Sequence, residues 1–514
     1  MKLRSNILKL ALFATGLAGI VAEYVLSTLA TYFLGNSVFQ FTMIVSIMLF
    51  SMGLGSRLSQ AIRTNLLYAF VVIEFILSVL SSTVSLLAYT ASAYTIYTGA
   101  VIYSLSVIIG LLIGMEIPIV IRLNDKFEEL RVNISLVMEK DYYGSLLGGV
   151  FFAFVGLPFL GLTYTPFMLG SVNFLVAIGL YFVLRPSLSA RNIRLLGIYG
   201  VGVALIIGGG AAFAGPIIDF GEQARYQDKV IYAKQSAYQR IVITEAKGNH
   251  WLYINGNLQL STVDEVLYHE PLVHPALSLL PQVKQVLILG GGDGCAVREV
   301  LKYPSVEKIV LVDLDPAMTQ LAASHPVLAT LNQGALEHPM VSIINQDAYT
   351  WIEAQTDYYD AIIIDLPDPK TIELGRLYSY EFYTMCYNRL RKHGVMVTQA
   401  GSPYYAPLAF NCIDTTMAAA GFVTQGLHNQ VLTLGEWGWV LGVKGWQNKA
   451  QLKPALQQLA FDGLQLRWLN NEAMGILTNT GKPLLPGMEK RPQINSIHNP
   501  VLERYYRNAN WELY

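Results

Sequence analysis

Seven runs of about twenty apolar residues, each long enough to cross a bilayer as a helix, fill the first 215 residues of the chain. No other feature limits the fold as strongly. The runs lie near residues 10–33, 38–56, 66–88, 96–120, 142–161, 164–184 and 195–215. The sequence therefore predicts a multi-span α-helical membrane domain of seven spans over residues 1–215.

Composition supports a chain that lies partly in lipid. Of its 514 residues, 53% are hydrophobic and 14% are charged, whereas roughly 25% are charged in an ordinary soluble domain. Beyond about residue 215 the charge density of a soluble domain returns, so the boundary is expected within residues 215–235. The first apolar run is too long for a cleavable signal peptide and is expected to remain as an anchor. A net charge of −1 provides no basic field for nucleic acid as a partner.

Lysines and arginines gather in the loops on one side of the predicted spans. By the positive-inside rule this side, which includes the N-terminus, is cytoplasmic. An odd number of spans then puts the soluble part outside, whereas the cofactor argued below is expected in the cytosol. Two explanations stay open: one run is re-entrant or interfacial, or the catalytic part faces outward. We expect a multi-pass protein of the cell (inner) membrane. The basic residues are Lys2, Arg4, Lys9, Arg57, Arg63, Arg122, Lys126, Arg131, Lys140, Arg185, Arg191 and Arg194.

Three acids, Glu23, Glu74 and Glu116, fall inside predicted spans. An ionised acid there costs at least a few kcal/mol unless it is paired or hydrated. These side chains are therefore expected to face protein or water and not lipid. Two interpretations remain open: a path for cations or polyamines, and hydrogen bonding between helices or protonated acids.

The segment from Val286 to Asp315 predicts a strand, a glycine-rich turn, a helix and a second strand. Asp313 lies about twenty residues beyond the turn, where a carboxylate can accept both hydroxyls of a ribose. Asp293 within the turn disfavours a pyrophosphate and favours a cationic sulfonium cofactor of the adenosylmethionine type. The turn contains Gly290, Gly291, Gly292 and Gly294.

The soluble part shows two patterns of strands. Alternating apolar residues over 230–260, with turns at Lys247-Gly-Asn and Asn255-Gly-Asn, predict a small antiparallel sheet. Further strands at 285–289, 308–313, 341–344, 360–364 and 394–398 alternate with helices, which predicts an open α/β, Rossmann-like sheet of the methyltransferase type. We expect a linker and small β domain over 216–280, the Rossmann-like domain over 281–445 and a C-terminal extension over 446–514.

Acids recur at the ends of these strands. In such sheets ligands bind beyond the carboxyl ends of the strands, so the acids are expected to converge on one cleft. A lone acid after a strand is more often a helix cap, but five in register favour a site. The five are Asp293, Asp313, Asp347, Asp365 and Asp368. Cys295, Cys386 and Cys412 show neither a disulfide framework nor metal-ligand spacing, so no metal is expected.

Short motifs distinguish the soluble part: YQRI at Tyr238–Ile241, Gln259, DEVLYHE at Asp264–Glu270, LGGGDG at Leu289–Gly294, LVDLD at Leu311–Asp315, QDA at Gln346–Ala348 and DLPDP at Asp365–Pro369. With these motifs the chain resembles the spermidine synthases, the polyamine aminopropyltransferases, over roughly residues 230–445. The N-terminal spans resemble those of membrane-fused members of the family, and DYYGSLLGG at Asp141–Gly149 is a further similarity.

The resemblance implies that decarboxylated S-adenosylmethionine is a co-substrate, with no permanently bound cofactor, and that methylthioadenosine leaves. It implies that Asp313 holds the ribose, that Asp347 holds the adenine amino group and that Asp365 and Asp368 face a diamine such as putrescine, giving spermidine. It also implies a homodimer. The implied amine-binding residues are His269, Asp293, Asp368, Gln259 and Tyr268, and the implied nucleoside-binding residues are Gln239, Gly290, Gly292, Asp313, Asp347 and Ala348.

The chemistry gives independent reasons for these residue types. A primary amine is protonated near neutral pH, so a carboxylate that attracts the ammonium and takes its proton can activate it. Asp365 is the candidate catalytic base. The sulfur leaves as a neutral thioether, so no acid is needed. A diamine carries two positive charges, which several carboxylates can pair and orient, and Asp293 and Asp368 fit that role.

Departures from the family pattern put the acceptor in doubt. Leu366 and Pro367 stand where small hydroxyl residues are usual, and Lys370-Thr-Ile replaces a glycine-proline pair. Gln399-Ala-Gly401 stands where a glutamate is usual, and Leu432 stands where a tyrosine is expected before GEWGW at Gly435–Trp439. Gln399, Tyr404 and Trp437 are candidate pocket walls.

Two alternatives differ in class from an aminopropyltransferase. One is a membrane polyamine transporter or sensor with a non-catalytic ligand-binding domain, which the acids within the spans and the altered amine pocket motivate. The other is an S-adenosylmethionine-dependent methyltransferase. It suits the fold but has no need of the pair Asp365 and Asp368.

Overall fold

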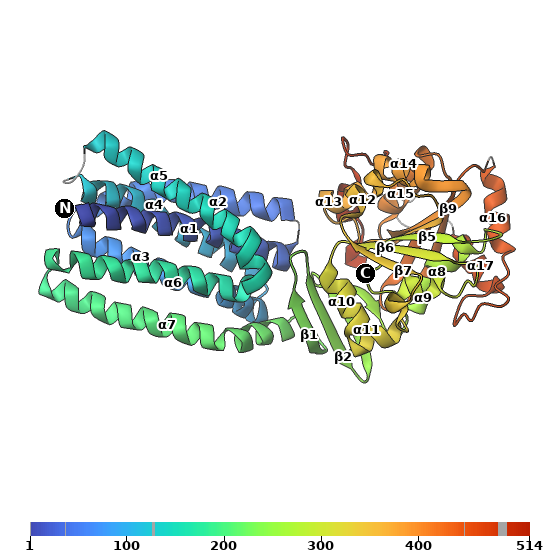
Figure 1. Cartoon of the computed structure of the whole chain (residues 1–514), viewed down its shortest axis with the longest axis horizontal. Helices are drawn as coiled ribbons and strands as arrows, with labels where there is room; N and C mark the ends of the chain where they lie inside the picture. Colours follow the sequence, from blue (N-terminus) through green and yellow to red (C-terminus); the bar gives the residue numbers. More distant parts are fainter. Residues whose placement is uncertain (1, 36, 126–128, 447, 482–490, 514) are drawn as a thin grey trace. The chain divides into compact units, whose positions relative to one another are not determined.

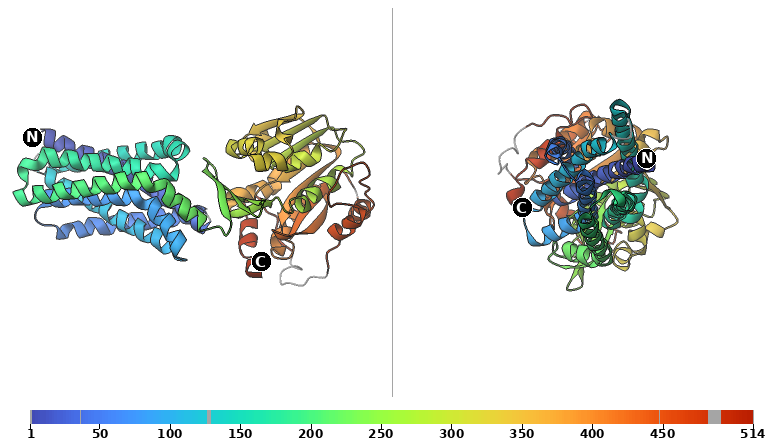
Figure 2. Two further views of the ribbon diagram at one scale, coloured as in Figure 1. Left: turned by 90° about the horizontal axis from the view of Figure 1, so that it is seen from below. Right: turned by 90° about the vertical axis from the view of Figure 1, so that its left-hand side faces the viewer.

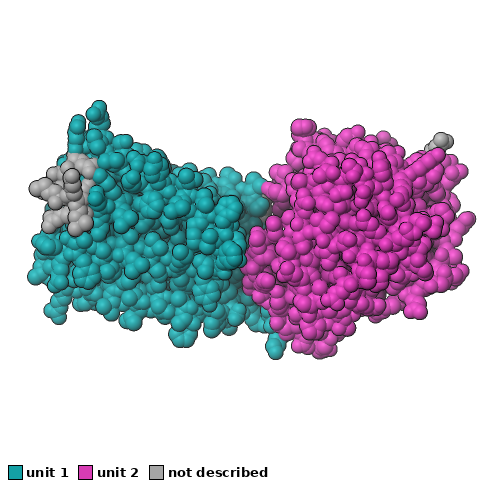
Figure 3. All heavy atoms as spheres, viewed as in Figure 1, with its two compact units in different colours: residues 1–230 teal, residues 231–514 magenta. Residues whose placement is uncertain are grey.

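The computed structural model describes the chain except for residues 1, 36, 126–128, 447, 482–490 and 514. Lys126, one of the basic loop residues, lies outside the described residues, as do three parts of the C-terminal extension, 447, 482–490 and 514. The chain forms two compact units, Met1–Val230 and Ile231–Tyr514 (Figure 3). Unit 2 contains most of the small antiparallel sheet, the α/β sheet and the described C-terminal segment.

Unit 1 is a bundle of long apolar helices that run side by side (Figures 1 and 2). Their residues are apolar on nearly all faces, a composition typical of helices that lie in a large core or cross a membrane. A π-helical turn, Phe152–Leu160, joins α5 to α6, and Gly161 after it has a φ of 62°. The helices are α1 (Lys2–Leu34), α2 (Ser37–Leu58), α3 (Leu66–Tyr94), α4 (Thr98–Asn124), α5 (Leu130–Phe151), α6 (Gly161–Leu184) and α7 (Ala190–Gln223).

The described residues contain six helical segments that are long and apolar enough to cross a membrane, and not the seven expected from the sequence. The difference lies in Leu130–Ser187, a segment of 58 residues that counts as one and contains α5, the π-helical turn and α6. It contains both expected runs, 142–161 and 164–184, and the backbone leaves the helical conformation between them at Gly161, where φ is 62° and ψ is −172°. The two expected runs are therefore present as α5 and α6, with no loop of several residues between them.

Glycines let the helices of unit 1 approach one another closely. A Cβ atom at Gly55 of α2 would lie 2.0 Å from the carbonyl oxygen of Leu111 in α4. A Cβ atom at Gly144 of α5 would lie 2.0 Å from the carbonyl oxygen of Phe13 in α1. Small residues at helix contacts allow the two backbones to pack closely, which strengthens van der Waals contact between the helices.

The small antiparallel sheet has the order β1-β2-β3-β4 and confirms the expectation from the alternating pattern. Its tight turns place Lys247, Gly248, Asn255 and Gly256 at positive φ, as two-residue hairpin turns require. The strands are β1 (Lys229–Gln235), β2 (Arg240–Ala246), β3 (Asn249–Ile254) and β4 (Asn257–Ser261).

The larger sheet of unit 2 has seven strands in the order β10-β11-β9-β8-β5-β6-β7. The strands β9-β8-β5-β6-β7 are mutually parallel, and β11 pairs antiparallel with both β10 and β9. This is the Rossmann-like, methyltransferase-type sheet that the sequence predicts, with a hairpin added at one edge. The strands are β5 (Gln285–Gly290), β6 (Lys308–Asp313), β7 (Val341–Asn345), β8 (Tyr359–Asp365), β9 (Leu390–Gly401), β10 (Val423–Val431) and β11 (Gly435–Val443).

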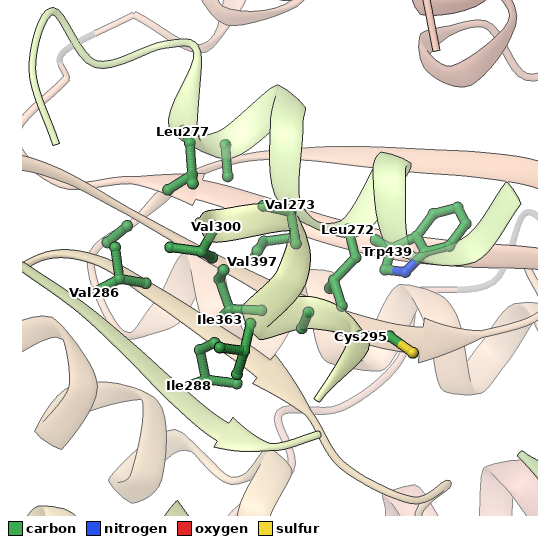
Figure 4. Packing of buried hydrophobic residues seen from close by; sticks show 14 of the residues in the cluster. Leu272, Val273, Leu277, Val286, Ile288, Cys295, Val300, Ile363, Val397 and Trp439 are labelled. Carbon is green, nitrogen blue, oxygen red and sulfur yellow. The ribbon is translucent and has the colours of Figure 1, made fainter. Parts of the chain in front are cut away.

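Helices cover both faces of this sheet. On one face, Figure 4 shows Leu272 and Val273 packed with Ile288, Val300 and other apolar side chains. A second cluster covers the other face and includes side chains from the C-terminal segment. The helices are α8 (Val266–Leu277), α9 (Cys295–Val300), α10 (Pro316–Ser324), α11 (Pro326–Leu331), α12 (Ala348–Ala354), α13 (Ile372–Gly375), α14 (Tyr380–Arg389), α15 (Pro407–Ala419), α16 (Lys449–Gln457), α17 (Asn471–Thr478) and α18 (Leu502–Arg507).

The close contact at Gly55 predicts that alanine substitutions at two glycines of α2 change the stability of the bundle by different amounts. Gly55→Ala forces a methyl group against the Leu111 carbonyl, so it should lower the stability of the bundle by about 1–3 kcal/mol. Gly53→Ala is the matched control, because a Cβ atom there meets no atom within 4 Å. Thermal unfolding of the detergent-purified chain measures both, and equal unfolding midpoints would contradict the packing described.

Candidate functional site

The glycine turn after β5 lies against the end of β8. The Gly291 N–H donates to the carbonyl oxygen of Asp365 at 2.8 Å. A Cβ atom at Gly290, whose φ is 82°, would lie 2.0 Å from that same oxygen, so only glycine fits. The Gly292 N–H donates to Asp313 Oδ2 at 3.1 Å. The turn therefore brings together the acids that end β6 and β8.

Asp313 is held at the carboxyl end of β6. Its second oxygen accepts the N–H of Asp315 at 2.9 Å. Burial raises the pKa of Asp313 to about 6, although hydrogen bonds from the backbone oppose the shift. Ser236 Oγ donates to Asp315 Oδ2 at 2.7 Å and accepts the N–H of Gln239 at 3.0 Å. The loop that carries Gln239 is thus fastened beside Asp313.

Asp347 and Ala348 begin α12, after β7. Asp347 Oδ1 accepts the N–H of Thr350 at 3.0 Å and so caps the helix. Its Oδ2 pairs with Arg376 Nη2 at 2.5 Å. Ala348 is buried. A ligand amino group would share Asp347 with Arg376, whose side chain is 43% exposed and free to move aside.

On the other side of the glycine turn, His269, Asp293 and Asp365 converge. His269 Nε2 lies 4.0 Å from Asp293 Oδ1 and 3.9 Å from Asp365 Oδ2. One oxygen of each acid and one nitrogen of His269 all lie within 4.8 Å of one another. This spacing suits a small cation or an ammonium group between the carboxylates.

Charge decides the protonation of this cluster. Burial alone would lower the pKa of His269, but the hydrogen bond to Glu265 and the charges of Asp293 and Asp365 raise it to about 9. Burial raises the pKa of Asp365 to about 6, against the opposing charge of His269. At neutral pH the imidazole is therefore protonated, Asp365 is ionised, and His269 has no free lone pair with which to bind a metal ion.

Tyr268 places a hydroxyl on the candidate base. Its Oη donates to Asp365 Oδ1 at 2.7 Å. Burial, and then the charge of Asp365, raise the pKa of Tyr268 far above its usual range, so the phenol remains a donor. The ring packs edge-on against His269 and Trp439.

A buried ion-pair network supports His269 from behind and was not identified from the sequence. His269 Nδ1 lies 2.9 Å from Glu265 Oε2, and Arg298 donates to both oxygens of Glu265 at 3.0 and 2.8 Å. Arg298 also donates to Glu299 at 2.8 Å. Despite burial, the hydrogen bonds from His269 and Arg298 lower the pKa of Glu265 to about 2. The i, i+4 spacing of Glu265 and His269 was the available signal for this pair.

Asp368 lies in a separate group of polar side chains. Tyr506 Oη, from the C-terminal helix α18, donates to Asp368 Oδ2 at 2.6 Å. Gln399 Nε2 lies 3.4 Å from Asp368 Oδ1, and Lys370 Nζ lies 3.6 Å from Oδ2. Tyr506 is 138 residues from Asp368 in the chain, and no motif pointed to it.

Three further candidates, Gln259, Leu432 and Trp437, form no hydrogen bond with the acids of the site in the described residues. Gln259 donates to the backbone oxygens of Asn257 and Leu258, both at 3.2 Å, so its amide folds back on its own strand. Asn257 Oδ1 accepts Lys370 Nζ at 2.7 Å, which ties β4 to the loop after β8. Leu432 is 68% exposed and forms no wall of the site, whereas Trp437 is buried in the core.

The network predicts a large cost for removing Glu265. Glu265→Gln leaves the buried Arg298 guanidinium without its bidentate partner, so stability should fall by about 3 kcal/mol or more. Glu307→Gln is the control, because its pair with Lys284 is exposed and contributes about 1 kcal/mol at most. Thermal unfolding of the full chain compares the two variants, and a similar loss in both would contradict a supporting role for Glu265.

Comparisons with known proteins agree with the motifs. A family model described as "Spermine/spermidine synthase domain" matches residues 265–454. Polyamine aminopropyltransferase 2 of Aquifex aeolicus is 40% identical, over 98% of each chain. The polyamine aminopropyltransferase of Oceanobacillus iheyensis is 36% identical, over 97% of this chain and 96% of its own. That of Leptospira interrogans is also 36% identical, over 95% of each chain. Since these matches include both units, the chain is an enzyme of the polyamine aminopropyltransferase family.

Proposed function

We propose that unit 2 transfers the aminopropyl group of decarboxylated S-adenosylmethionine to a diamine such as putrescine, giving spermidine and methylthioadenosine. One observation carries the proposal: Asp365 ends β8 within 4 Å of His269 and directly beside the glycine turn that reaches Asp313. A nucleophile site and a nucleoside site thus share one edge of the sheet. Membership in the family supports the same reaction.

The nucleoside of the donor would lie along the ends of β6 and β7. Asp313 is placed to accept the ribose hydroxyls, with Gln239 on the loop fastened beside it. Asp347 and Ala348 would bind the adenine edge once Arg376 moves aside. Gly290 and Gly292 keep this edge free of side chains, because a Cβ atom at either position would collide with Asp365 or Asp313.

The carboxylates explain a preference for the decarboxylated donor. Asp293 and Asp365 face the region beyond the sulfonium, and His269 neutralises only one of their two charges. The carboxylate of ordinary S-adenosylmethionine would meet this negative charge, whereas a donor that ends in an ammonium would be attracted. The site therefore selects by repulsion as well as by attraction.

Asp365 would act as the base in a direct displacement. It takes a proton from the attacking ammonium group, the amine nitrogen forms a bond to the aminopropyl carbon, and the carbon–sulfur bond breaks. The electron pair stays on sulfur, which leaves as a neutral thioether. His269 and Tyr268 hold the carboxylate in position from two sides.

The far ammonium of the acceptor would bind at Asp368. The Tyr506 hydroxyl donates to one oxygen of this acid. Beside it, Gln399 Nε2 donates to Tyr378 Oη at 2.6 Å. Lys370 Nζ, also near Asp368, lies 5.9 Å from the centre of the Tyr506 ring. Lys370 thus occupies the place that a substrate ammonium would take over an aromatic ring.

Unit 1 would anchor the enzyme in a membrane. Tyr32 Oη, at the end of α1, donates to Glu222 Oε1, at the end of α7, at 2.5 Å. The chain therefore leaves the bundle at the end opposite to its start, as an odd number of crossings requires. This disfavours a re-entrant run, and the basic loops then favour a cytoplasmic N-terminus with unit 2 on the opposite side of the membrane.

Removing the base should abolish turnover without abolishing donor binding. Asp365→Asn should lower the rate constant for aminopropyl transfer by at least about 100-fold, because a general base typically contributes 10²–10⁴-fold. Asp357→Asn, an exposed acid just before the same strand, is the control. Mass spectrometry of methylthioadenosine and spermidine measures turnover, and ordinary S-adenosylmethionine in place of the donor tests selectivity.

The wild-type rate should also fall as the pH drops below about 6, because Asp365 is protonated and inactive below its raised pKa. Unchanged turnover in Asp365→Asn, or methyl transfer from ordinary S-adenosylmethionine, would contradict the proposed reaction.

Lys370 gives a prediction for the acceptor. Lys370→Gln removes an internal cation that competes for Asp368, so the KM for putrescine should fall up to about fivefold, within the 1 kcal/mol that a partly exposed pair is worth. The KM for the donor should not change. Lys392→Gln, on an exposed position of β9, is the control. A rise in the KM for putrescine would show instead that Lys370 assists binding.

A further inference from the structure

The outer surface of the bundle of unit 1 holds a groove that aminopropyl transfer does not use. Inside the bundle, the acids Glu23, Glu74 and Glu116 are buried among protein atoms, as the sequence predicts. Between α6 and α7, which run side by side (Figure 1), the surface is instead open over a volume of about 320 Å³. The lining of this groove includes Phe174, Ile178 and Phe182 of α6 and Leu196, Val201 and Ala204 of α7.

The groove is apolar and faces outward. Phe182 of α6 and Val201 of α7 are each 63% exposed. The hydroxyl of Tyr181, which also lines the groove, donates to the carbonyl oxygen of Ile193 at 3.4 Å. In a bundle that crosses a membrane, an outward apolar surface meets the hydrocarbon chains of lipids. An apolar chain is therefore the kind of ligand that fits this groove.

A glycine on α7 gives the groove its depth. The nearest described atom to a Cβ atom placed at Gly197 is Tyr181 Oη, at 3.7 Å, so this position has room for a larger side chain. Farther along α7, a Cβ atom at Gly200 would lie 3.3 Å from Ile178 Cδ1, so the two helices approach closely there. The open volume beside this contact suits one flexible chain and not a helix, which is about 10–12 Å across.

An arginine lies at one end of the groove. Arg185 follows Tyr181 by four residues and Ile178 by seven, and its backbone is still helical, with φ −47° and ψ −41°. Residues at these spacings share one face of a helix, and their side chains lean toward its N-terminus. The side chain of Arg185 therefore leans back toward the turn that carries Tyr181. Among the described residues, Arg185 has no ion pair or side-chain hydrogen bond.

More positive charge gathers at the same end of the two helices. Arg191 and Arg194 are exposed in the first turns of α7, next to the short connection that follows Arg185. These arginines belong to the loops that the positive-inside rule places in the cytoplasm. Anionic lipids are concentrated in the cytoplasmic leaflet, and basic pockets between membrane helices on that side bind their head groups. A guanidinium can bind a phosphate group through two parallel hydrogen bonds.

We propose that the groove between α6 and α7 is a binding site for one phospholipid with a net negative charge. Its phosphate would bind at Arg185, with Arg191 and Arg194 nearby, and one acyl chain would lie along the groove over Gly197. The ligand class follows from the order of the features on the page, an unpaired cation followed along the helix by an apolar groove.

Native mass spectrometry of the full-length chain tests this site. The detergent-purified protein is incubated with equal amounts of phosphatidylglycerol, which is anionic, and phosphatidylcholine, which is zwitterionic, both with the same acyl chains. The wild-type chain should retain one phosphatidylglycerol at least about fivefold more often than one phosphatidylcholine. Gly197→Leu, which fills the groove, should lower the retention of phosphatidylglycerol at least about fivefold, and Arg185→Gln should remove the preference for the anionic lipid.

Each variant has a matched control. Gly202→Leu is the control for Gly197→Leu, because Gly202 lies about 140° farther around α7 and a Cβ atom there meets no described atom within 4 Å. Arg131→Gln is the control for Arg185→Gln, because Arg131 is an exposed arginine at the start of α5. Both controls should retain lipid as the wild type does. Arg185 is exposed, so its variant keeps the test valid if Gly197→Leu fails to fold.

Several results would overturn the proposal. Equal retention of the two lipids by the wild type, or equal effects of a variant and its control, would do so. A dimer that Gly197→Leu dissociates would show that a second copy of the chain occupies the groove. The inference rests on the proposed membrane anchor, which flotation of the chain with phosphatidylglycerol vesicles tests separately. A chain that does not float would overturn the anchor and the lipid site together, whereas a chain that floats without lipid preference would overturn the site alone.

Discussion

The buried ion pair between Arg298 and Glu265 is the interaction on which the catalytic unit depends most. It joins α9, the helix that follows the glycine turn, to the residue that begins α8. Both side chains are almost fully buried, so neither charge is tolerable without the other. Glu265 in turn fixes His269, and His269 lies between Asp293 and Asp365. The position and charge of the candidate base thus depend on the buried guanidinium of Arg298.

The parallel strands position two acids of the candidate site, and a segment far along the chain contacts a third. Asp313 and Asp365 end parallel strands on either side of β5, so the order of the strands alone brings these two acids to the same edge of the sheet. Asp368 is different, because its partner Tyr506 comes from the last described helix. The proposed acceptor position therefore includes a residue of the C-terminal segment, and Gln399, which departs from the family pattern, lies beside the same acid.

Much of this arrangement could be predicted from the sequence, for reasons that particular residues show. The two hairpin turns of the small sheet and the strands β5 to β9 carry local signals, namely positive-φ residues and apolar runs that end in acids. The hairpin of β10 and β11 was missed, because its residues mix glycine, tryptophan and polar side chains without clean alternation. The contacts of Tyr506 with Asp368 and of Arg298 with Glu265 join segments far apart in the chain, so no local sequence pattern predicts them. The π-helical turn at Phe152–Leu160 lies inside the expected run 142–161, where a run of apolar residues does not distinguish a π-helix from an α-helix.

The charge on His269 tests this account most directly. Nitrogen NMR of the full-length chain with ¹⁵N-labelled histidine rings, with the signal assigned by its loss in His269→Gln, reports the protonation of that imidazole. The account predicts a protonated ring at neutral pH that titrates near pH 9, since Glu265, Asp293 and Asp365 outweigh the effect of burial. A ring that is neutral at pH 7 would contradict it, because Asp365 would then lack the cation that holds it in place.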